Sequence, residues 1–90
     1  MANGDEERIV AKGLKSPGPL LMVKKRLAER GAFRIRVIVS DDSAAREIVS
    51  YLKARGAIAE IDKAGADFHV VADLKSFRRD SPGEGDTSDA

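Results

Sequence analysis

The 90-residue sequence contains no cysteine and no tryptophan, and it has a single histidine, His69. Without cysteine the chain cannot form a disulfide, act through a thiolate or bind a metal through sulfur. One histidine is also too few for a histidine-based metal site. We therefore expect neither a metal nor another cofactor. No apolar run is long enough to cross a bilayer, and a formal net charge of +1 gives no overall attraction to nucleic acid.

The composition is that of one small globular domain, with 42% hydrophobic and 34% charged residues. Both ends of the chain are polar and acidic and have little apolar surface to bury. We therefore expect residues 1–7 to be a disordered N-terminus, 8–75 to form the domain and 76–90 to be a disordered acidic tail. The polar N-terminal residues do not resemble a signal peptide, which favours a cytoplasmic protein.

Hydrophobic periodicity and turn residues predict six elements in the order β-α-β-α-β-β. The expected strands are 8–12, 33–39, 57–62 and 67–74, and the expected helices are 17–30 and 43–55. We predict an α/β (α+β) two-layer sandwich, in which both helices cover one face of a four-stranded mixed sheet and the last two strands form a hairpin. The other face would be mixed and partly wet, carrying Arg34, Arg36, Ile38, His69, Val71 and Asp73.

The apolar positions of each element predict the core. In the first helix these are Leu20, Val23, Leu27 and Ala28, whereas Met22, Lys25 and Arg26 point outward. In the second helix they are Ala45, Ile48, Val49 and Leu52. In the strand 33–39 they are Phe33, Ile35, Val37 and Val39.

The stretch 13–21 is the most distinctive part of the sequence. Gly13 ends the first strand, and a helix is expected to start at Pro17 because proline suits the first helical turn. Ser16 then occupies the N-cap position. Pro17 and Pro19 lack N–H groups, so two of the usual free donors at a helix start are absent. We expect a stiff backbone that holds Ser16 at the positive end of a helix dipole.

This stretch and the element order resemble the TusA/SirA-like sulfur-carrier family, over residues 8–74. The family signature is a Cys-Pro-x-Pro motif that opens the first helix after a Gly-Leu approach, matched here by Gly13, Leu14, Ser16, Pro17 and Pro19, with Gly18 at the variable position. The resemblance implies a sulfurtransferase that carries sulfur as a persulfide on the motif cysteine. Its partners would be a cysteine desulfurase-like sulfur donor and a protein acceptor, in tRNA thiolation, molybdenum-cofactor chemistry or sulfur oxidation.

Ser16 stands where the family has its cysteine. A thiol at a helix N-terminus ionises readily, with a pKa that falls to roughly 3.5–7.5, whereas a serine hydroxyl neither ionises there nor holds a sulfane sulfur. We therefore expect the chain as written to be inactive in relay. Ser16 is either an engineered replacement of cysteine or a natural variant, and the sequence is compatible with both.

Basic residues surround the motif. From Lys12 to Arg36 there are eight Lys or Arg residues and one acid, Glu29. Charge runs usually form a solvated surface, but here they also suit a docking patch for an acidic protein partner. The residues of this predicted patch are Lys12, Lys15, Met22, Lys24, Lys25 and Arg26.

Three alternatives remain open. Ser16 could act as a nucleophile with His69 as its base, although no third group is evident to orient the histidine. The same element order occurs in the RNA-binding C-terminal domain of a bacterial translation initiation factor, but the outer sheet face lacks the aromatic residues that stack bases. The chain could also be a non-catalytic regulatory domain that binds a partner. We expect a monomer that binds neither nucleic acid nor membrane.

Overall fold

The computed structural model describes residues 6–15, 17–29 and 33–78. Six elements follow one another in the predicted order. They are β1 (Glu6–Val10), α1 (Gly18–Glu29), β2 (Arg34–Val39), α2 (Asp42–Ala54), β3 (Ile58–Ala64) and β4 (Asp67–Asp73). Neither helix of this described part has the length and apolar character of a membrane span.

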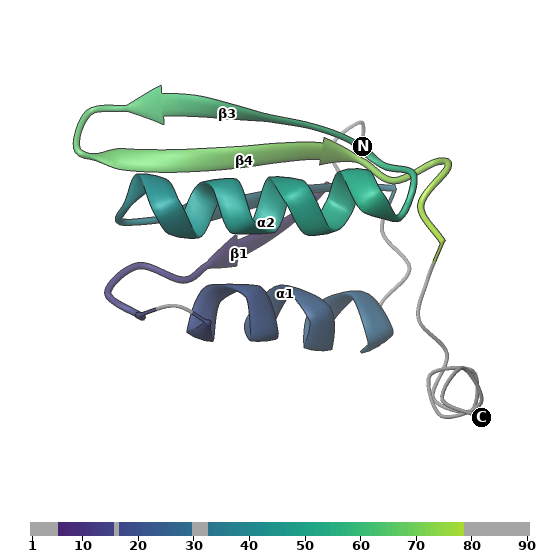
Figure 1. Cartoon of the computed structure of the whole chain (residues 1–90), viewed down its shortest axis with the longest axis horizontal. Helices are drawn as coiled ribbons and strands as arrows, with labels where there is room; N and C mark the ends of the chain where they lie inside the picture. Colours follow the sequence, from purple (N-terminus) through teal and green to yellow (C-terminus); the bar gives the residue numbers. More distant parts are fainter. Residues whose placement is uncertain (1–5, 16, 30–32, 79–90) are drawn as a thin grey trace.

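The four strands form one mixed sheet in the order β1-β2-β4-β3. β1 runs parallel to β2, whereas β4 lies between β2 and β3 and is antiparallel to both. The two helices lie on the same side of this sheet, with α2 packed against β4 and β3 and α1 beside α2 (Figure 1). The predicted two-layer sandwich is confirmed.

Alternate strand residues point toward the helices and form the core, as the period of two predicts. Ile35, Val37 and Val39 of β2 are fully buried. Phe33, which we expected beside them, is 58% exposed, because it lies at the end of the sheet, one residue before the first register pair of β2, where its carbonyl accepts the backbone N–H of Leu74 at 2.7 Å. The rest of the core comes from both helices and from the other three strands, and includes Ile9, Val23, Leu27, Ala45, Ile48, Leu52, Ala59, Val70 and Ala72.

α1 presents a different face to the core from the one that the periodicity predicted. Its buried residues are Pro19, Val23 and Leu27, one turn apart, because the ring of Pro19 adds apolar surface to the first turn. The buried stripe is therefore rotated. Met22 packs half-buried against the core and Ala28 is exposed, so the predictions of an outward Met22 and an inward Ala28 were wrong.

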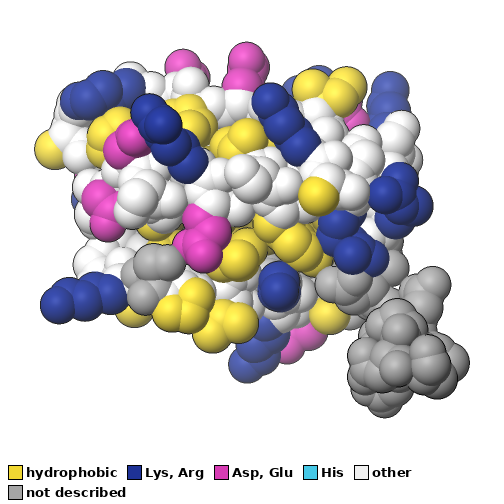
Figure 2. Space-filling view, viewed as in Figure 1, with side chains coloured by type: hydrophobic (Ala, Val, Ile, Leu, Met, Phe, Trp, Pro, Cys, Tyr) yellow, Lys and Arg dark blue, Asp and Glu magenta, His cyan; other side chains and the backbone are white. Residues whose placement is uncertain are grey.

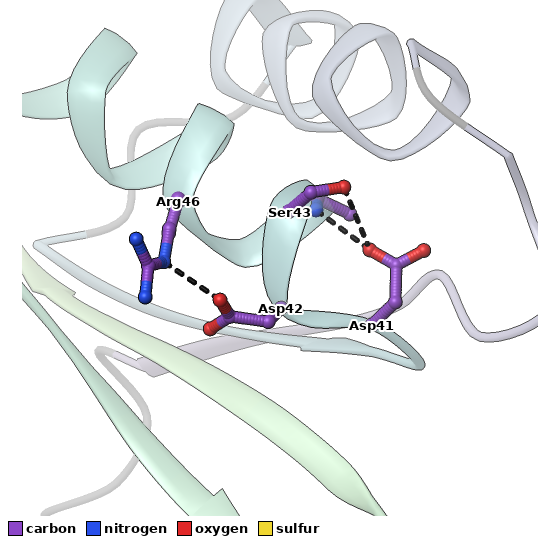
Figure 3. Close-up of polar contacts among 5 residues, drawn as sticks. Asp41, Asp42, Ser43 and Arg46 are labelled. Carbon is purple, nitrogen blue, oxygen red and sulfur yellow. Dashed lines mark hydrogen bonds and ion pairs between the residues drawn. The ribbon is translucent and has the colours of Figure 1, made fainter.

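A single carboxylate caps the start of α2. Asp41 accepts the backbone N–H of Ala44 at 2.7 Å and the hydroxyl of Ser43 at 3.3 Å (Figure 3). Asp42, the first residue of the helix, pairs with Arg46 one turn later at 2.7 Å. This satisfies donors that a helix start leaves free, and the helix begins one residue earlier than predicted.

The chain remains packed after β4. The backbone N–H of Arg78 donates to the carbonyl of Arg55 at 2.8 Å, and its guanidinium donates to the carbonyl of Ala54 at 3.1 Å. Residues 76–78 thus satisfy carbonyls at the end of α2, three residues beyond our predicted domain boundary. Residues 6 and 7 belong to β1, so the N-terminal boundary was placed two residues too late. The remaining expected disorder, in 1–5 and 79–90, lies outside the described residues.

Two isoleucines provide a matched test of the core. Ile48→Ala should lower the free energy of unfolding by about 2–4 kcal/mol, because Ile48 is fully buried and its truncation leaves a cavity. Ile58→Ala makes the same change at a side chain that is 74% exposed and should cost less than about 0.5 kcal/mol. Urea unfolding measures both values. Equal losses would contradict this assignment of the core.

Two glycines test the packing of residues 76–78. Gly56 and Gly65 have φ angles of +96° and +65°, so alanine is strained at either position, by about 1–2 kcal/mol. A Cβ at Gly56 would also lie 2.5 Å from the carbonyl oxygen of Ser76, whereas one at Gly65 would meet nothing within 4 Å. Gly56→Ala should therefore destabilise the protein more than Gly65→Ala in thermal unfolding. Equal shifts of the midpoint would mean that residues 76–78 do not pack there in solution.

Candidate functional site

The turn between β1 and α1 is held in place by the end of β2. Gly13 has a φ of +82°, a conformation that glycine adopts without steric cost. Its backbone N–H donates to the hydroxyl of Ser40 at 2.9 Å. Just before the turn, the N–H of Ala11 donates to the carbonyl of Ile38 at 2.8 Å. These two bonds attach the approach to α1 to the central sheet.

Two local hydrogen bonds organise the motif around α1. The N–H of Gly18 donates to the carbonyl of Lys15 at 2.7 Å, and the N–H of Leu21 donates to the carbonyl of Pro17 at 3.0 Å. Ser16, the predicted site residue, follows Lys15 in the chain and lies outside the described residues. α1 begins at Gly18, one residue after the predicted start, and its first turn contains no acidic residue. The positive end of the helix dipole is therefore not neutralised by a carboxylate of that turn.

The two prolines of the motif have different surroundings. Pro19 is among the fully buried side chains and anchors the first turn of α1 in the core. Pro17 is exposed and contributes its carbonyl to the helix. Because neither residue has an N–H, each restrains the backbone without adding a donor. The motif is therefore rigid on the side of the core and accessible on the side of solvent.

Gly18 provides room for an exposed leucine. A Cβ at Gly18 would lie 3.3 Å from the Cβ of Leu14 and 3.8 Å from its Cδ1, so Leu14 packs directly over the first turn of α1. Leu21 and Lys25 follow Gly18 at spacings of three and seven residues and share its side of the helix. We call this line of Leu14, Gly18, Leu21 and Lys25 the α1 stripe.

The α1 stripe combines apolar surface with positive charge. Leu14 is 41% exposed and Leu21 is 56% exposed, and Lys25 is also exposed. Figure 2 shows hydrophobic side chains gathered over the beginning of α1. Lys15, directly before Ser16 in the chain, is exposed as well. A contiguous exposed apolar patch with a polar rim is a feature of surfaces that contact another protein.

The other residues of the predicted patch do not join this surface. Lys12 forms an ion pair with Asp67 at 3.0 Å. Arg26 is paired with Glu7 of β1, which connects α1 to the edge of the sheet. Both cations therefore have partners within the protein. Met22 is half-buried, so the members of the patch that are exposed and form no ion pair with a described residue are Lys15, Lys24 and Lys25.

Lys24 belongs to an aromatic cluster that the sequence did not indicate. Its ammonium group lies 5.1 Å from the centre of the Tyr51 ring, and the guanidinium of Arg55 lies 5.9 Å from the same ring. Phe77 packs edge-on against Tyr51, with ring centres 6.2 Å apart. Since these residues come from α1, α2 and the segment after β4, no local pattern could have predicted the cluster.

His69 is engaged on the opposite side of the sheet from the helices. Its Nδ1 lies 3.0 Å from a guanidinium nitrogen of Arg36. Because a guanidinium only donates, this imidazole nitrogen accepts. This hydrogen bond holds the imidazole against β2 of the sheet. It gives no support to the alternative in which His69 acts as a base for Ser16. Among the described residues no group of three His, Cys, Asp or Glu side chains could hold a metal ion.

The fold is similar to that of a SirA-like protein from Desulfitobacterium hafniense, whose crystal structure is known. The two chains are 26% identical in sequence and superpose with a TM-score of 0.65, over 73% of this chain and 93% of that chain. No protein-family model matches the chain, and no curated protein matches it.

The structural match agrees with the resemblance indicated by the motif and the element order. It covers nearly the whole of the other chain, and the sequence identity adds to the likeness of the folds. The resemblance to the TusA/SirA-like family is thereby confirmed: this chain has the SirA-like fold, and its sequence contains no cysteine.

Proposed function

We propose that this protein is a domain of the sulfur-carrier type that binds its protein partners through the start of α1, with Ser16 at the position where a carrier holds its cysteine. The observation that supports this most directly is the Pro17-Gly18-Pro19 start of α1, attached to the sheet through Gly13, in a chain with a SirA-like fold. With serine at position 16, the chain does not carry sulfur as a persulfide.

The reason is chemical. In sulfur relay, the acceptor thiolate attacks the terminal sulfur of the donor's persulfide. A new sulfur–sulfur bond forms on the acceptor while the bond in the donor breaks, and the donor leaves as a thiolate, so there is no net oxidation. A serine hydroxyl is not ionised at neutral pH and forms no stable bond to sulfane sulfur. No other position can replace it, because the sequence contains no cysteine.

The proposed partners are a cysteine desulfurase-like donor and a protein acceptor, as the resemblance implies. The proposed location is the cytoplasm, as the polar N-terminal residues favour. The α1 stripe and Lys15 would form the contact. Leu14 and Leu21 supply exposed apolar area, which is removed from water in a complex. Lys15 and Lys25 supply charge that speeds the encounter with an acidic surface.

A purely regulatory domain is the second candidate. It is favoured by the same absence of cysteine, because a domain that only binds needs no thiol. In that case the partner would still dock on the α1 stripe, but restoring a thiol would not produce an efficient sulfur acceptor. The two candidates therefore differ in a measurable reaction.

Ser16→Cys tests the carrier proposal. With a cysteine desulfurase and L-cysteine, the variant should gain the mass of one sulfur atom, which a thiol reductant removes. Ser50→Cys is the matched control, because it places the same thiol at an exposed position of α2. We expect labelling to be at least about tenfold faster at position 16, because a helix start favours the thiolate and docking orients it. Equal rates at both positions, or no transfer from an active donor to position 16, would contradict the proposal.

Charge reversal tests the proposed contact. Lys15→Glu combined with Lys25→Glu should slow association of the Ser16→Cys protein with the desulfurase by about tenfold at low salt, and less at high salt. Lys53→Glu is the control, since Lys53 is exposed in the last turn of α2 and lies outside the α1 stripe. Biolayer interferometry gives the association rates. If the lysine pair has no more effect than Lys53→Glu, the α1 stripe is not the docking surface.

A further inference from the structure

The face of the sheet that carries no helix has a regular arrangement of side chains. Residues on this outer face alternate with those of the core, and the strand register places them in rows across the four strands. One row is Glu6, Arg34, Asp73 and Ile58, the next is Arg8, Arg36, Val71 and Glu60, and the third is Val10, Ile38, His69 and Asp62. Lys12, paired with Asp67, lies beyond the third row.

Charge on this outer face is separated by strand. The half formed by β1 and β2, together with Lys12, has four basic residues and one acid, a formal charge of +3. The half formed by β4 and β3 has four carboxylates and no lysine or arginine, a formal charge of −4. The acids of this second half are Glu60, Asp62, Asp67 and Asp73. The boundary between the two halves runs along the strands, between β2 and β4.

Part of this charge is not used within the chain. Arg36 contacts Glu6 at 3.8 Å and His69 at 3.0 Å, so it is held by its own neighbours. In contrast, Arg34 and Arg8 are exposed and form no ion pair with any described residue, and Glu60 on the acidic half is also exposed. Apolar surface accompanies them at both edges, where Val10 is 56% exposed and Ile58 is 74% exposed.

We infer that the outer face associates with the outer face of a second copy of this chain. One two-fold rotation, about an axis parallel to the strands along the boundary between β2 and β4, brings the basic half of one copy over the acidic half of the other. That rotation places β1 and β2 of one copy over β3 and β4 of the other. The two copies then contribute the same surface to one interface, as is usual in homodimers.

The rotation also selects individual pairs. Within the first row it brings Arg34 opposite Asp73 of the second copy, and within the second row it brings Arg8 opposite Glu60 of the second copy. A two-fold axis perpendicular to the strands would instead place the basic half on the basic half, where like charges repel. The arrangement therefore has one favourable orientation, similar to the aligned packing of two sheets.

The size of the face predicts weak association. Four strands spaced about 4.8 Å apart, with about 3.3 Å per residue along each strand, give roughly 400 Å² per copy. Stable dimers bury about 800 Å² per partner. We therefore expect a dissociation constant on the order of 100 μM at low salt, with a strong dependence on ionic strength. At lower protein concentrations we expect the chain to be a monomer.

This inference is independent of the proposed function, because the outer face and the α1 stripe lie on opposite sides of the sheet. Its test is sedimentation of the full chain between roughly 10 μM and 1 mM, at about 25 mM and about 500 mM NaCl. The expected result is a monomer–dimer equilibrium at low salt that weakens at least tenfold at high salt. A monomer over the whole range at low salt would overturn the inference.

Charge exchange between two copies tests the orientation. Arg34→Asp and Asp73→Arg should each weaken self-association at least tenfold, because each creates two like-charge pairs in the dimer. An equimolar mixture of the two variants should associate again. In the mixed dimer, the aspartate introduced at position 34 of one chain meets the arginine introduced at position 73 of the other, and the unchanged Arg34 and Asp73 also meet across the interface. Each chain in the mixture keeps its own like-charge pair, because residues 34 and 73 are also cross-strand neighbours, so recovery cannot come from a repaired monomer.

Lys53→Glu, which changes an exposed charge on α2 by the same amount, is the control and should leave self-association unchanged. Circular dichroism verifies that each variant is folded, and Arg34→Gln with Asp73→Asn provides a milder pair if either charge reversal unfolds the chain. The milder variants should each weaken association by a smaller factor. Failure of the charge-reversed mixture to associate, or an equal loss in Lys53→Glu, would overturn the proposed interface.

Discussion

Burial of the inner face of the sheet beneath two helices is the interaction on which the rest of the structure depends. The strands contribute fully buried residues such as Ile9, Ile35 and Val70, and α2 contributes Ile48 and Leu52. The described residues form one core cluster of this kind, and a domain of this size is marginally stable. Every other feature, including the turn before α1, is positioned by attachment to this core.

The candidate site shows how that attachment works. The motif has one proline in the core and one at the surface, and its glycine turn is bonded to the end of β2 through Ser40. The sheet therefore sets where α1 starts, and α1 sets which side chains surround that start. A rigid start of this kind keeps the exposed Leu14 and Leu21 in one arrangement, which reduces the entropy lost when a partner binds.

The two faces of the molecule differ in how charge is used. On the helical side, several cations are engaged within the protein, as Arg26 is with Glu7 and Lys24 is with the Tyr51 ring. On the outer sheet face, most charges of opposite sign lie on opposite halves. Arg34 and Arg36 alternate in β2, and Arg8 lies in β1 together with the acid Glu6. The charged outer residues of β3 and β4 are all carboxylates. Local sequence determines the sign of each strand's face, and the strand order β1-β2-β4-β3 brings the like strands together.

Much of the fold could be predicted from the sequence, for local reasons. The alternation in 34–39, the Asp41 cap and the glycines at 13 and 56 act over a few residues, so they fix the element order and most boundaries to within two residues. The motif before α1 was recognisable for the same reason. The outer-face set of Arg34, Arg36 and Asp73 followed from the period of two.

Other features depended on contacts between residues far apart in the chain. Met22 and Arg26 were expected to face outward, yet one packs on the core and the other pairs with Glu7, because Pro19 rotates the buried stripe of α1. Phe77 was assigned to a disordered tail, yet it packs on Tyr51 from a different helix. The sequence by itself determined the elements and the chemistry available at the start of α1. Only the tertiary structure decided which charges are paired and which remain exposed, because that depends on neighbours that no local pattern specifies.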